Sequence, residues 1–484
     1  MLNAKLTRAL LWMVVVILAI AVLALGLRVA ALRNIPALEP WHTWVPDDLH
    51  SDVIDRLDWA GYLAAEDRLM QTMREEMTAS LQPFERVAYN RYFDQSAVYP
   101  GRFATDWNRS YEARPNGVVR GAAVLLHGLT DSPYSLRHLG EHLRQQGFVV
   151  IAIRMPGHGT VPAGLTHADW EDWMAATRLA VREASAQLPK GAPLLMVGFS
   201  NGGALAMKYS LDALADPSLV MPKQLVLISP MIGVTRYAQF AGLAGLPAVL
   251  PAFAKAAWLN VLPEFNPFKY NSFPITAARQ TVELTDALQR SLDAASRSGQ
   301  LSRLPPILTF QSLADSTVST PAVISNLYER LPANGSELVI FDLNRSLNYG
   351  PLLRPEMATL GDRLLPERER NYDLTVISNS PQDSRATTLH TPAHSQKQER
   401  QALAASYPPE LFSLSHVALP FPPDDALYGQ HPDAGEDFGI RLGTLTPRGE
   451  RGVLIAGLDL FQRVTSNPFY GYLVQRVDQV LPQH

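Results

Sequence analysis

The chain has 484 residues, of which 47% are hydrophobic and 18% are charged, and its formal net charge at pH 7 is -4. A chain of this length and composition can bury a large core, and its small net charge gives no electrostatic reason to expect nucleic acid as a partner. The sequence contains no cysteine, which excludes disulfides, thiolate metal sites, a cysteine nucleophile and a lipidated N-terminal cysteine.

The N-terminal region contains an apolar run, Ala9 to Leu27, without a charged residue, and Lys5, Arg8 and Arg28 flank it. At about 1.5 Å per residue, a helix of this length crosses most of the roughly 30 Å hydrocarbon core of a bilayer. A cleaved signal peptide is the alternative, but its apolar region usually has only about 7–15 residues. We therefore expect residues 1–33 to form a retained single-pass anchor, with the following domain periplasmic or otherwise extracytoplasmic.

Residues 34–101 are expected to form a juxtamembrane segment, with a proline-rich linker followed by a helix. The helix has an apolar stripe on one face, made of Trp59, Leu63, Met70, Met73 and Met77. A stripe at helical spacing is more often a packing surface than a ligand site. We expect this segment to dock on the main domain.

Residues 102–484 alternate apolar runs of strand length with helical segments. The runs are 122–126, 148–153, 194–197, 224–228, 306–310 and 337–342. This alternation predicts an α/β fold with a mostly parallel sheet covered by helices on both faces. A helical, loop-rich, apolar stretch interrupts it over about 231–304, and we interpret that stretch as a cap.

The region from 343 to 411 is harder to assign, because its one strand-like run, 373–378, is surrounded by polar and charged residues. We interpret it as an insertion, and both an ordered element and a flexible flap remain open. The tail from 467 to 481 predicts a closing helix.

Residues 198–202, Gly198-Phe199-Ser200-Asn201-Gly202, connect one of these strands to a helix. A serine at such a turn adopts a strained backbone that exposes its hydroxyl at the end of the sheet, and the two glycines remove Cβ atoms that would otherwise collide. The following helix directs its N-terminal N–H groups toward the hydroxyl, which favours negative charge there. A Gly- and Ser-rich turn without chemistry is the alternative, and the flanking strand and helix favour a nucleophile.

A serine hydroxyl is a weak nucleophile until a base takes its proton, so Ser200 requires a histidine and a carboxylate that fixes the tautomer of that histidine. The oxyanion formed by its attack requires N–H donors. We assign these to the backbone of Asn201 and of Leu129, which lies in the loop after an earlier strand. His127 and His158 are expected to be structural.

Together these motifs resemble the α/β-hydrolases of the esterase, monoacylglycerol lipase and lysophospholipase-like group. The resemblance covers about residue 102 to the C-terminus and rests on His127-Gly128-Leu129-Thr130, Pro156-Gly157-His158-Gly159, the 198–202 turn, and Asp315 within Ser312-Leu313-Ala314-Asp315-Ser316-Thr317-Val318. It implies an α/β-hydrolase fold and a triad in the order Ser, Asp, His, without a metal or other cofactor. The N-terminal membrane segment and the long distance from acid to base depart from the family.

Asp315 follows a strand of the resumed sheet, which is the position that the resemblance implies for the triad acid. An N-cap of the helix near Pro321 is the alternative for this residue. Asp342 follows another strand and is the reserve candidate.

Five histidines follow Asp315, at positions 390, 394, 416, 431 and 484. We select His416 as the base, because apolar residues on both sides can hold its loop and the prolines after it stiffen the loop. The resemblance also implies a base on a loop after the last strands. In this interpretation the 343–411 insertion lengthens the path between acid and base without changing where they meet.

The sequence therefore predicts a membrane-anchored serine hydrolase that cleaves carboxylic esters, of a lipid-like or acylglycerol type, through an acyl-serine intermediate. Candidates for an acyl pocket in the cap are Phe240, Leu243, Leu246 and Trp258, which could equally form the cap's own core. A non-catalytic scaffold that binds a membrane partner and a serine peptidase of the same fold are the alternatives.

Overall fold

The computed structural model describes residues 11–13, 15, 16, 19, 36–233, 251–346, 353–444, 449, 463 and 465–481. Most of the predicted membrane span over residues 9–27 lies outside this set, as do three of the pocket candidates, Phe240, Leu243 and Leu246. Within the described ranges, no helix is both long enough and apolar enough to cross a membrane.

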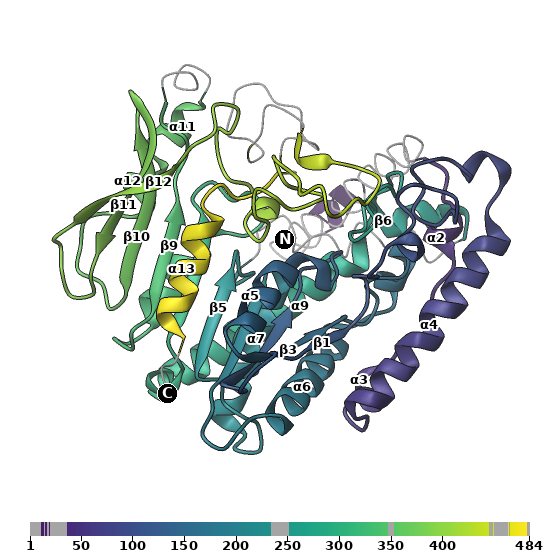
Figure 1. The fold of residues 1–484 in the computed structure, drawn as a ribbon, viewed down its shortest axis with the longest axis horizontal. Helices are drawn as coiled ribbons and strands as arrows, with labels where there is room; N and C mark the ends of the chain where they lie inside the picture. Colours follow the sequence, from purple (N-terminus) through teal and green to yellow (C-terminus); the bar gives the residue numbers. More distant parts are fainter. Residues whose placement is uncertain are drawn as a thin grey trace, which may run out of the picture.

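A ten-stranded sheet forms the centre of the molecule, in the order β1-β3-β2-β4-β5-β8-β9-β10-β11-β12 (Figure 1). Its central strands are parallel to one another and buried along their whole length. They are β2 (Gly121–Leu126), β3 (Phe148–Ile153), β4 (Leu194–Phe199), β5 (Gln224–Ile228), β8 (Ile307–Ser312) and β9 (Glu337–Phe341). Short β1 (Tyr111–Ala113) pairs antiparallel with β3 at one edge. The predicted α/β class with a mostly parallel sheet is confirmed.

Helices cover both faces of this sheet because alternate residues of each strand point to opposite sides. Val124 of β2 belongs to one core with α6 (Trp170–Ala186), α7 (Asn201–Ala215) and α9 (Ile275–Arg297). Leu125, the next residue, belongs to the other core with α5 (Arg137–Gln145) and α13 (Tyr470–Val480). The closing helix expected at the C-terminus is α13.

The predicted cap over 231–304 is shorter in the structure, because α9 is part of the main body. Leu284, Leu288 and Leu292 of α9 are buried in the same core as α6 and α7. The described remainder consists of the 3-10 helix η7 (Pro251–Ala257) and a small antiparallel pair, β6 (Trp258–Asn260) and β7 (Phe273–Pro274). Helical periodicity indicates an apolar face but not which surface covers it, so the sequence did not separate α9 from the cap.

The 343–411 region is ordered over most of its described residues and extends the main sheet. After the short helices α11 (Pro355–Ala358) and α12 (Leu360–Leu364), β10 (Asp373–Ser380) pairs parallel with β9. Then β11 (Asp383–Thr391) and β12 (Glu399–Ser406) add antiparallel strands at the edge. Only β10 was expected, because β12 is exposed over most of its length and has no apolar run.

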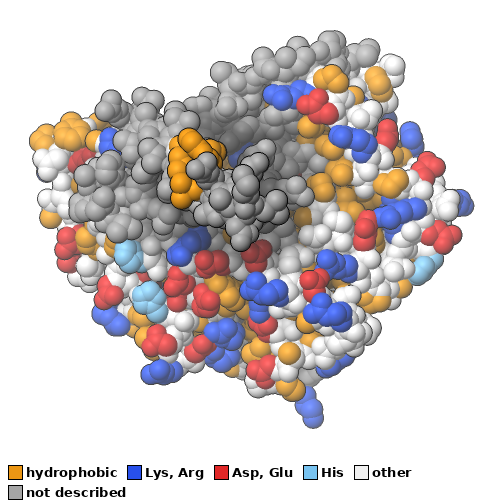
Figure 2. All heavy atoms as spheres, turned by 180° about the vertical axis from the view of Figure 1, so that it is seen from behind, with side chains coloured by type: hydrophobic (Ala, Val, Ile, Leu, Met, Phe, Trp, Pro, Cys, Tyr) orange, Lys and Arg blue, Asp and Glu red, His pale blue; other side chains and the backbone are white. Residues whose placement is uncertain are grey.

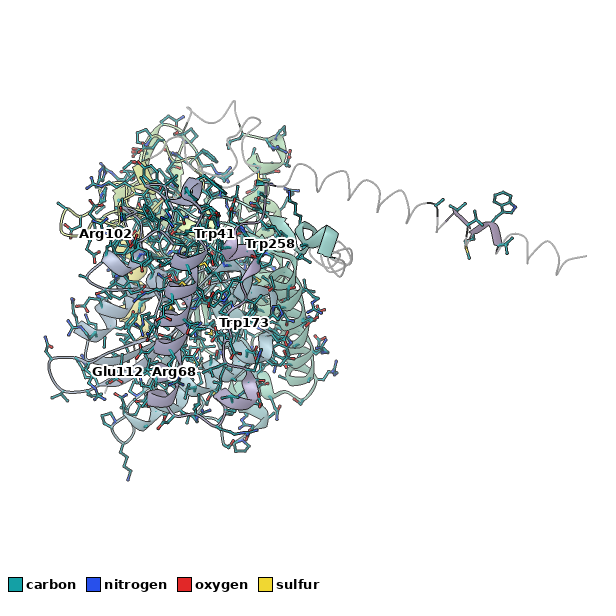
Figure 3. The ribbon with its side chains drawn as sticks, turned by 90° about the vertical axis from the view of Figure 1, so that its right-hand side faces the viewer. Trp41, Arg68, Arg102, Glu112, Trp173 and Trp258 are labelled. Atoms are coloured by element: carbon teal, nitrogen blue, oxygen red, sulfur yellow. The ribbon has the colours of Figure 1, made fainter. Side chains whose placement is uncertain are left out.

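The N-terminal segment packs against the main domain as predicted. It contains α2 (Pro40–Thr43), α3 (Ser51–Ile54) and α4 (Trp59–Ser80), followed by the 3-10 turn η1 (Pro83–Glu85). In the apolar stripe of α4, Trp59, Met70 and Met77 are buried, and Leu63 and Met73 are half-buried. The ring centroids of Trp41 and Trp258 lie 5.7 and 4.9 Å from that of the His42 imidazole, and the two tryptophans lie near each other in Figure 3. On the face opposite to Figure 1, the described surface mixes acidic and basic side chains (Figure 2).

A buried ion cluster around Arg154 joins the N-terminal segment to the end of β3. The guanidinium of Arg154 is 2.7 and 2.9 Å from the two carboxylate oxygens of Asp48 and 3.1 Å from Glu66. The hydroxyl of Tyr62 donates to the Arg154 carbonyl at 2.6 Å. Burial alone would raise the pKa of Asp48, but Arg154 and the N–H of Gly157 hold that pKa below its usual value. The segment is therefore fixed to the sheet by charges that have little access to water.

We expect Asp48→Asn to lower the free energy of unfolding by about 3–5 kcal/mol, because it leaves part of a buried guanidinium charge uncompensated. The control is Asp55→Asn, which breaks a more exposed ion pair with Arg178 and should cost at most about 1 kcal/mol. Urea unfolding of both variants measures the difference. Because the folded pKa of Asp48 is lowered, the difference from wild type should shrink as the pH falls through that pKa. Equal costs for the two variants would show that the cluster does not hold the segment.

Candidate active site

The loops that carry the predicted site residues leave the same edge of the sheet. Gly198 of β4 lies opposite Leu126 at the end of β2, and Phe199 lies opposite Ile228 at the end of β5. Parallel strands bring their carboxyl ends together, and ligands of open α/β sheets bind beyond that edge. The segments beginning at residues 127, 200 and 313 therefore start as neighbours.

Ser200 occupies a strained turn between β4 and α7. Its φ is 55° and its ψ is -115°, an unusual conformation for a residue with a side chain. Its backbone hydrogen bonds to the neighbouring strand and loop run from Ser200 N–H to the Ile228 carbonyl at 2.9 Å and from Met231 N–H to the Ser200 carbonyl at 3.0 Å. Ser200 is only 4% exposed, so it lies less open to solvent than the sequence indicated. The surrounding loops cover this edge of the sheet.

The two glycines of the turn are required by close approach of the backbone. A Cβ atom on Gly202 would lie 1.9 Å from the carbonyl oxygen of Leu126, and one on Gly198 would lie 2.4 Å from the carbonyl oxygen of Gly202. Neither contact is possible without moving the main chain. Helix α7 therefore crosses the end of β2 in direct backbone contact.

The loop after β2 passes beside Ser200 and is organised by His127. A Cβ on Gly128 would lie 3.3 Å from the Cβ of Ser200. The Nε2 atom of His127 accepts from the N–H of Met155 at 3.0 Å, so its Nδ1–H donates to the Gly128 carbonyl at 2.9 Å. Burial lowers the pKa of His127 well below its usual value, which keeps the ring neutral. His127 has the structural position that we expected.

His158 is also structural in its contacts. Its Nδ1 atom donates to the Pro156 carbonyl at 3.0 Å, and burial lowers its pKa to about 3. The indole of Trp173 donates to the same carbonyl at 3.1 Å. These contacts shape the 156–159 turn and place neither nitrogen at the nucleophile.

The two predicted oxyanion donors belong to residues next to or near Ser200. Asn201 is the first residue of α7, where a helix leaves its N–H groups without an intrahelical acceptor. Leu129 follows Gly128 in the adjacent loop. Across the described residues, neither the Asn201 N–H nor the Leu129 N–H has a hydrogen-bond acceptor. Their role as donors to an oxyanion at Ser200 stays a prediction.

Asp315 and His416 are in contact, although 101 residues separate them in sequence. The Nδ1 atom of His416 lies 2.9 Å from Oδ2 of Asp315, whose side chain is fully buried. The same carboxylate accepts from Gln311 Nε2 at 3.1 Å and from the N–H groups of Thr317 and Val318 at 2.8 and 2.9 Å. Burial would raise the pKa of Asp315, but His416 and these donors hold it below its usual value. An ionised Asp315 fixes the proton of the neutral ring on Nδ1 and leaves Nε2 as the basic nitrogen.

The loop that carries His416 is held at the ends of β8 and β9. The Ser312 hydroxyl donates to the Leu414 carbonyl at 2.7 Å, and Asn344 N–H donates to the Phe412 carbonyl at 2.9 Å. Phe412 and Leu414 are buried, as the apolar flanks of the loop predicted. The ring of His416 lies 5.3 Å from that of Phe199, the residue before Ser200. The candidate base thus lies beside the turn that holds the candidate nucleophile.

The alternatives for the acid have other partners. Ser319, and not Asp315, accepts from the Ala322 N–H and caps α10 (Thr320–Ala322). Asp342 forms an ion pair with Arg345 at 2.7 Å and accepts from the Ser378 hydroxyl at 2.7 Å. Its carboxylate is therefore committed to the sheet extension.

The other candidate histidines lie elsewhere or outside the described ranges. The Nδ1 atom of His390, in β11, lies 3.0 Å from the Thr375 hydroxyl in the sheet extension. His394 has a φ of 56° in the loop after β11. His431 is exposed, and His484 lies outside the described residues.

Trp258 was predicted to line a substrate pocket, and it is 1% exposed. Its indole contacts His42 edge to face, so the structure gives it a packing position between the cap and the N-terminal segment. A contact between Trp258 and substrate stays a prediction.

Lys269 is a site neighbour that sequence reasoning missed. Its ammonium lies 3.5 Å from the Leu129 carbonyl and 3.9 Å from the carboxylate of Asp131. The next residue, Tyr270, donates its N–H to the Thr130 carbonyl at 2.8 Å, where Thr130 has a φ of 62°. The cap loop, which connects β6 to β7, therefore holds the oxyanion loop after β2, residues 127–131, in place. A single lysine between two aromatic residues, Phe268-Lys269-Tyr270, was the available signal.

The model of a protein family described as "Serine aminopeptidase, S33" matches residues 117–344 of this chain. The chain is 27% identical over 180 residues to a thermostable monoacylglycerol lipase of Bacillus sp. (strain H-257), covering 37% of this chain and 66% of that protein. It is 40% identical over 52 residues to a carboxylesterase of Bacillus subtilis (strain 168), covering 11% and 21%. The matches thus span under two thirds of the first relative and about a fifth of the second.

Among solved structures, the chain is similar to one from the metagenome-derived lipolytic enzymes LipS and LipT, with 22% identity and a TM-score of 0.39. That match covers 49% of this chain and 88% of the other. The chain has the α/β-hydrolase fold, and the two relatives that it matches in sequence are named as a monoacylglycerol lipase and a carboxylesterase.

We expect Gly202→Ala to disrupt the turn, because its Cβ would overlap the Leu126 carbonyl. The variant should lose several kcal/mol of stability or fail to fold, as overlaps with backbone cannot relax by rotamer changes. The control is Gly471→Ala in α13, where no atom lies within 4 Å of the added Cβ. That change should stabilise by about 0.5–1 kcal/mol through helix propensity. Thermal unfolding compares the two, and a Gly202→Ala protein as stable as wild type would contradict the close crossing.

We expect Asp315→Asn to slow the labelling of Ser200 by a fluorophosphonate by roughly 10⁴-fold, the loss typical of a triad acid whose histidine takes the wrong tautomer. Asp342→Asn should retain most of the rate, because its carboxylate is bound to Arg345. The rates are measured on variants whose circular dichroism matches wild type. The reverse pattern would assign the acid to Asp342.

Proposed function

We propose that this protein is a serine hydrolase that cleaves carboxylic esters through an acyl-serine intermediate. The observation that carries the proposal is the contact between the carboxylate of Asp315 and the Nδ1 atom of His416. The imidazole of His416 also lies beside the ring of Phe199, the residue before Ser200. A buried, hydrogen-bonded carboxylate behind an imidazole is what activates a serine hydroxyl. A structural ion pair would not require a strained serine at the same place.

The reaction follows from these positions. His416 Nε2 takes the proton of Ser200 as the hydroxyl oxygen attacks the ester carbonyl. The N–H groups of Leu129 and Asn201 stabilise the resulting oxyanion. The C–O bond to the alcohol then breaks, the alcohol leaves with the proton from His416, and the acyl group stays on Ser200. Water, deprotonated by the same His416, releases the acid and restores the serine.

The substrate is proposed to be lipid-like, of the acylglycerol type. The relatives named as a monoacylglycerol lipase and a carboxylesterase support this class. The sequence of the cap supports it too, since Phe240, Leu243 and Leu246 are apolar residues placed before the strand that Asp315 follows. A retained single-pass anchor over residues 1–33 and an extracytoplasmic domain remain part of the proposal, because they would bring the site to such a substrate.

A serine peptidase of the same fold is the second candidate, because the matching family is described as a serine aminopeptidase. Both reactions use an acyl-serine and the same oxyanion donors. They differ in the leaving group, since an amine must be protonated by His416 more fully than an alcohol before it departs. Substrate comparison distinguishes the two.

We expect Ser200→Ala and His416→Ala to lower kcat for p-nitrophenyl esters and monoacylglycerols by several orders of magnitude, because members of a triad act as a unit. His431→Ala and His390→Ala are the controls and should keep most activity. The wild type should act on esters of graded chain length and leave aminoacyl p-nitroanilides intact. Turnover of the anilides in preference to the esters would favour the peptidase. Normal ester turnover by purified Ser200→Ala would contradict the mechanism itself.

A further inference from the structure

An apolar groove lies between the N-terminal segment and the cap loop, away from Ser200. Its volume is about 640 Å³, which is within the roughly 300–1,000 Å³ of small-molecule sites. One wall contains Pro36, Ala37, Phe84, Glu85, Val87, Tyr89 and Asn90, and the other contains Val261–Phe265. The walls come from parts of the chain that the predicted hydrolase mechanism does not use.

The wall after α4 exposes large apolar side chains to solvent. Phe84 is 71% exposed, Val87 is 51% exposed and Tyr89 is 58% exposed. Scattered apolar residues on a surface are ordinary, but three within six residues that line one groove mark an interaction surface. Exposing these apolar side chains to water does not stabilise the protein.

The groove lies close in sequence to the predicted membrane span, and this closeness indicates a lipid bilayer as its partner. Pro36 lies nine residues after Leu27, the end of the predicted membrane span. Nine residues reach at most about 30 Å when extended and about 14 Å as a helix. If residues 9–27 span the bilayer, the groove cannot be far from the lipid headgroups. A tyrosine beside a phenylalanine at that depth matches the aromatic residues typical of membrane interfaces.

The carboxylates in the groove wall are held by hydrogen bonds. Glu264 accepts from the N–H groups of Asn271 and Ser272 at 3.0 and 2.8 Å, and Glu85 accepts from Gln82 N–H at 2.6 Å. A hydrogen bond with Glu85, together with burial, raises the pKa of Glu39 to about 7. These carboxyl groups are therefore engaged in hydrogen bonds within the protein, whereas the side chains of Phe84, Val87 and Tyr89 face the solvent.

We propose that this groove is the face by which the domain lies on the lipid bilayer, with Phe84, Val87 and Tyr89 inserted among the lipids. The proposal rests on the membrane anchorage given under the proposed function and not on the chemistry at Ser200.

The groove and the oxyanion loop are joined by one short stretch of chain. Phe265 lines the groove, and Lys269 and Tyr270 contact the carbonyls of Leu129 and Thr130. In Figure 1, α2 and β6 lie at the upper right of the molecule, and the arrow of β5 points upward. A bilayer against the groove would therefore lie on the same side of the sheet as Ser200.

The absence of cysteine makes the test direct, because a single introduced thiol can be labelled in the full-length protein. We would label Phe84→Cys, Val87→Cys and Tyr89→Cys with a polarity-sensitive fluorophore and reconstitute them in phosphatidylcholine vesicles, with and without nitroxide on the acyl chains. Controls are Val118→Cys and Val220→Cys, which are 84% and 43% exposed and do not line the groove. We expect quenching by the nitroxide at 84, 87 and 89 and little at 118 and 220.

Equal quenching at all five positions, or failure of the protein to sediment with vesicles, would overturn the proposal. A Phe84→Glu/Val87→Glu double variant provides a functional comparison. It should cleave a short water-soluble ester at the wild-type rate and cleave monoacylglycerol in vesicles about tenfold more slowly. If the wild type cleaves no ester, the ester-hydrolase proposal fails and the quenching still decides this one. If ester cleavage is normal and quenching is absent, only the membrane face is wrong.

Discussion

The close crossing of α7 over the end of β2 is the constraint on which the site depends. Because Gly202 lies against the carbonyl of Leu126, the chain can leave β4 only through a sharp turn, and Ser200 is held at a φ of 55°. The loop that begins after Leu126 is drawn to the same place, which puts Leu129 beside the serine. One backbone contact therefore fixes both the proposed nucleophile and a proposed donor for its oxyanion, and the strain at Ser200 is balanced by the packing of buried strands around it.

The acid and base show how a long excursion of the chain can leave a site unchanged. Asn344, just after β9, binds the carbonyls of Leu411 and Phe412 with its side chain and main chain, at 2.8 and 2.9 Å. These hydrogen bonds join the two ends of the segment between Asn344 and Leu411, so the strands within that segment extend the sheet outward from β9. The chain therefore brings His416 to Asp315 as it would after a short loop. The cost of closing such a loop grows only slowly with its length.

The parts of the fold that the sequence predicts are those in which local pattern and tertiary environment agree. The strands at 148–153 and 224–228 have the predicted bounds, because parallel strands buried on both faces are continuous apolar runs. The edge strand β12 has polar residues on both faces, so only its neighbour defines it. The turn at Ser200 is a local motif and was recognised. The contact of Lys269 with Leu129 joins residues 140 apart and leaves no local signature.

The N-terminal segment is better understood as part of the site's support than as a tether. His42 Nε2 lies 2.9 Å from the Ser272 hydroxyl, and two residues earlier Tyr270 binds the oxyanion loop through Thr130. Asp48 and Arg154 fix the same segment to β3. Packed contacts thus continue from residue 41 to the neighbourhood of Ser200. If residues 1–33 cross a membrane, only residues 34 and 35 separate them in sequence from the described body of the protein, so the catalytic edge would be held close to it. Such an arrangement suits a substrate that is itself confined to the bilayer.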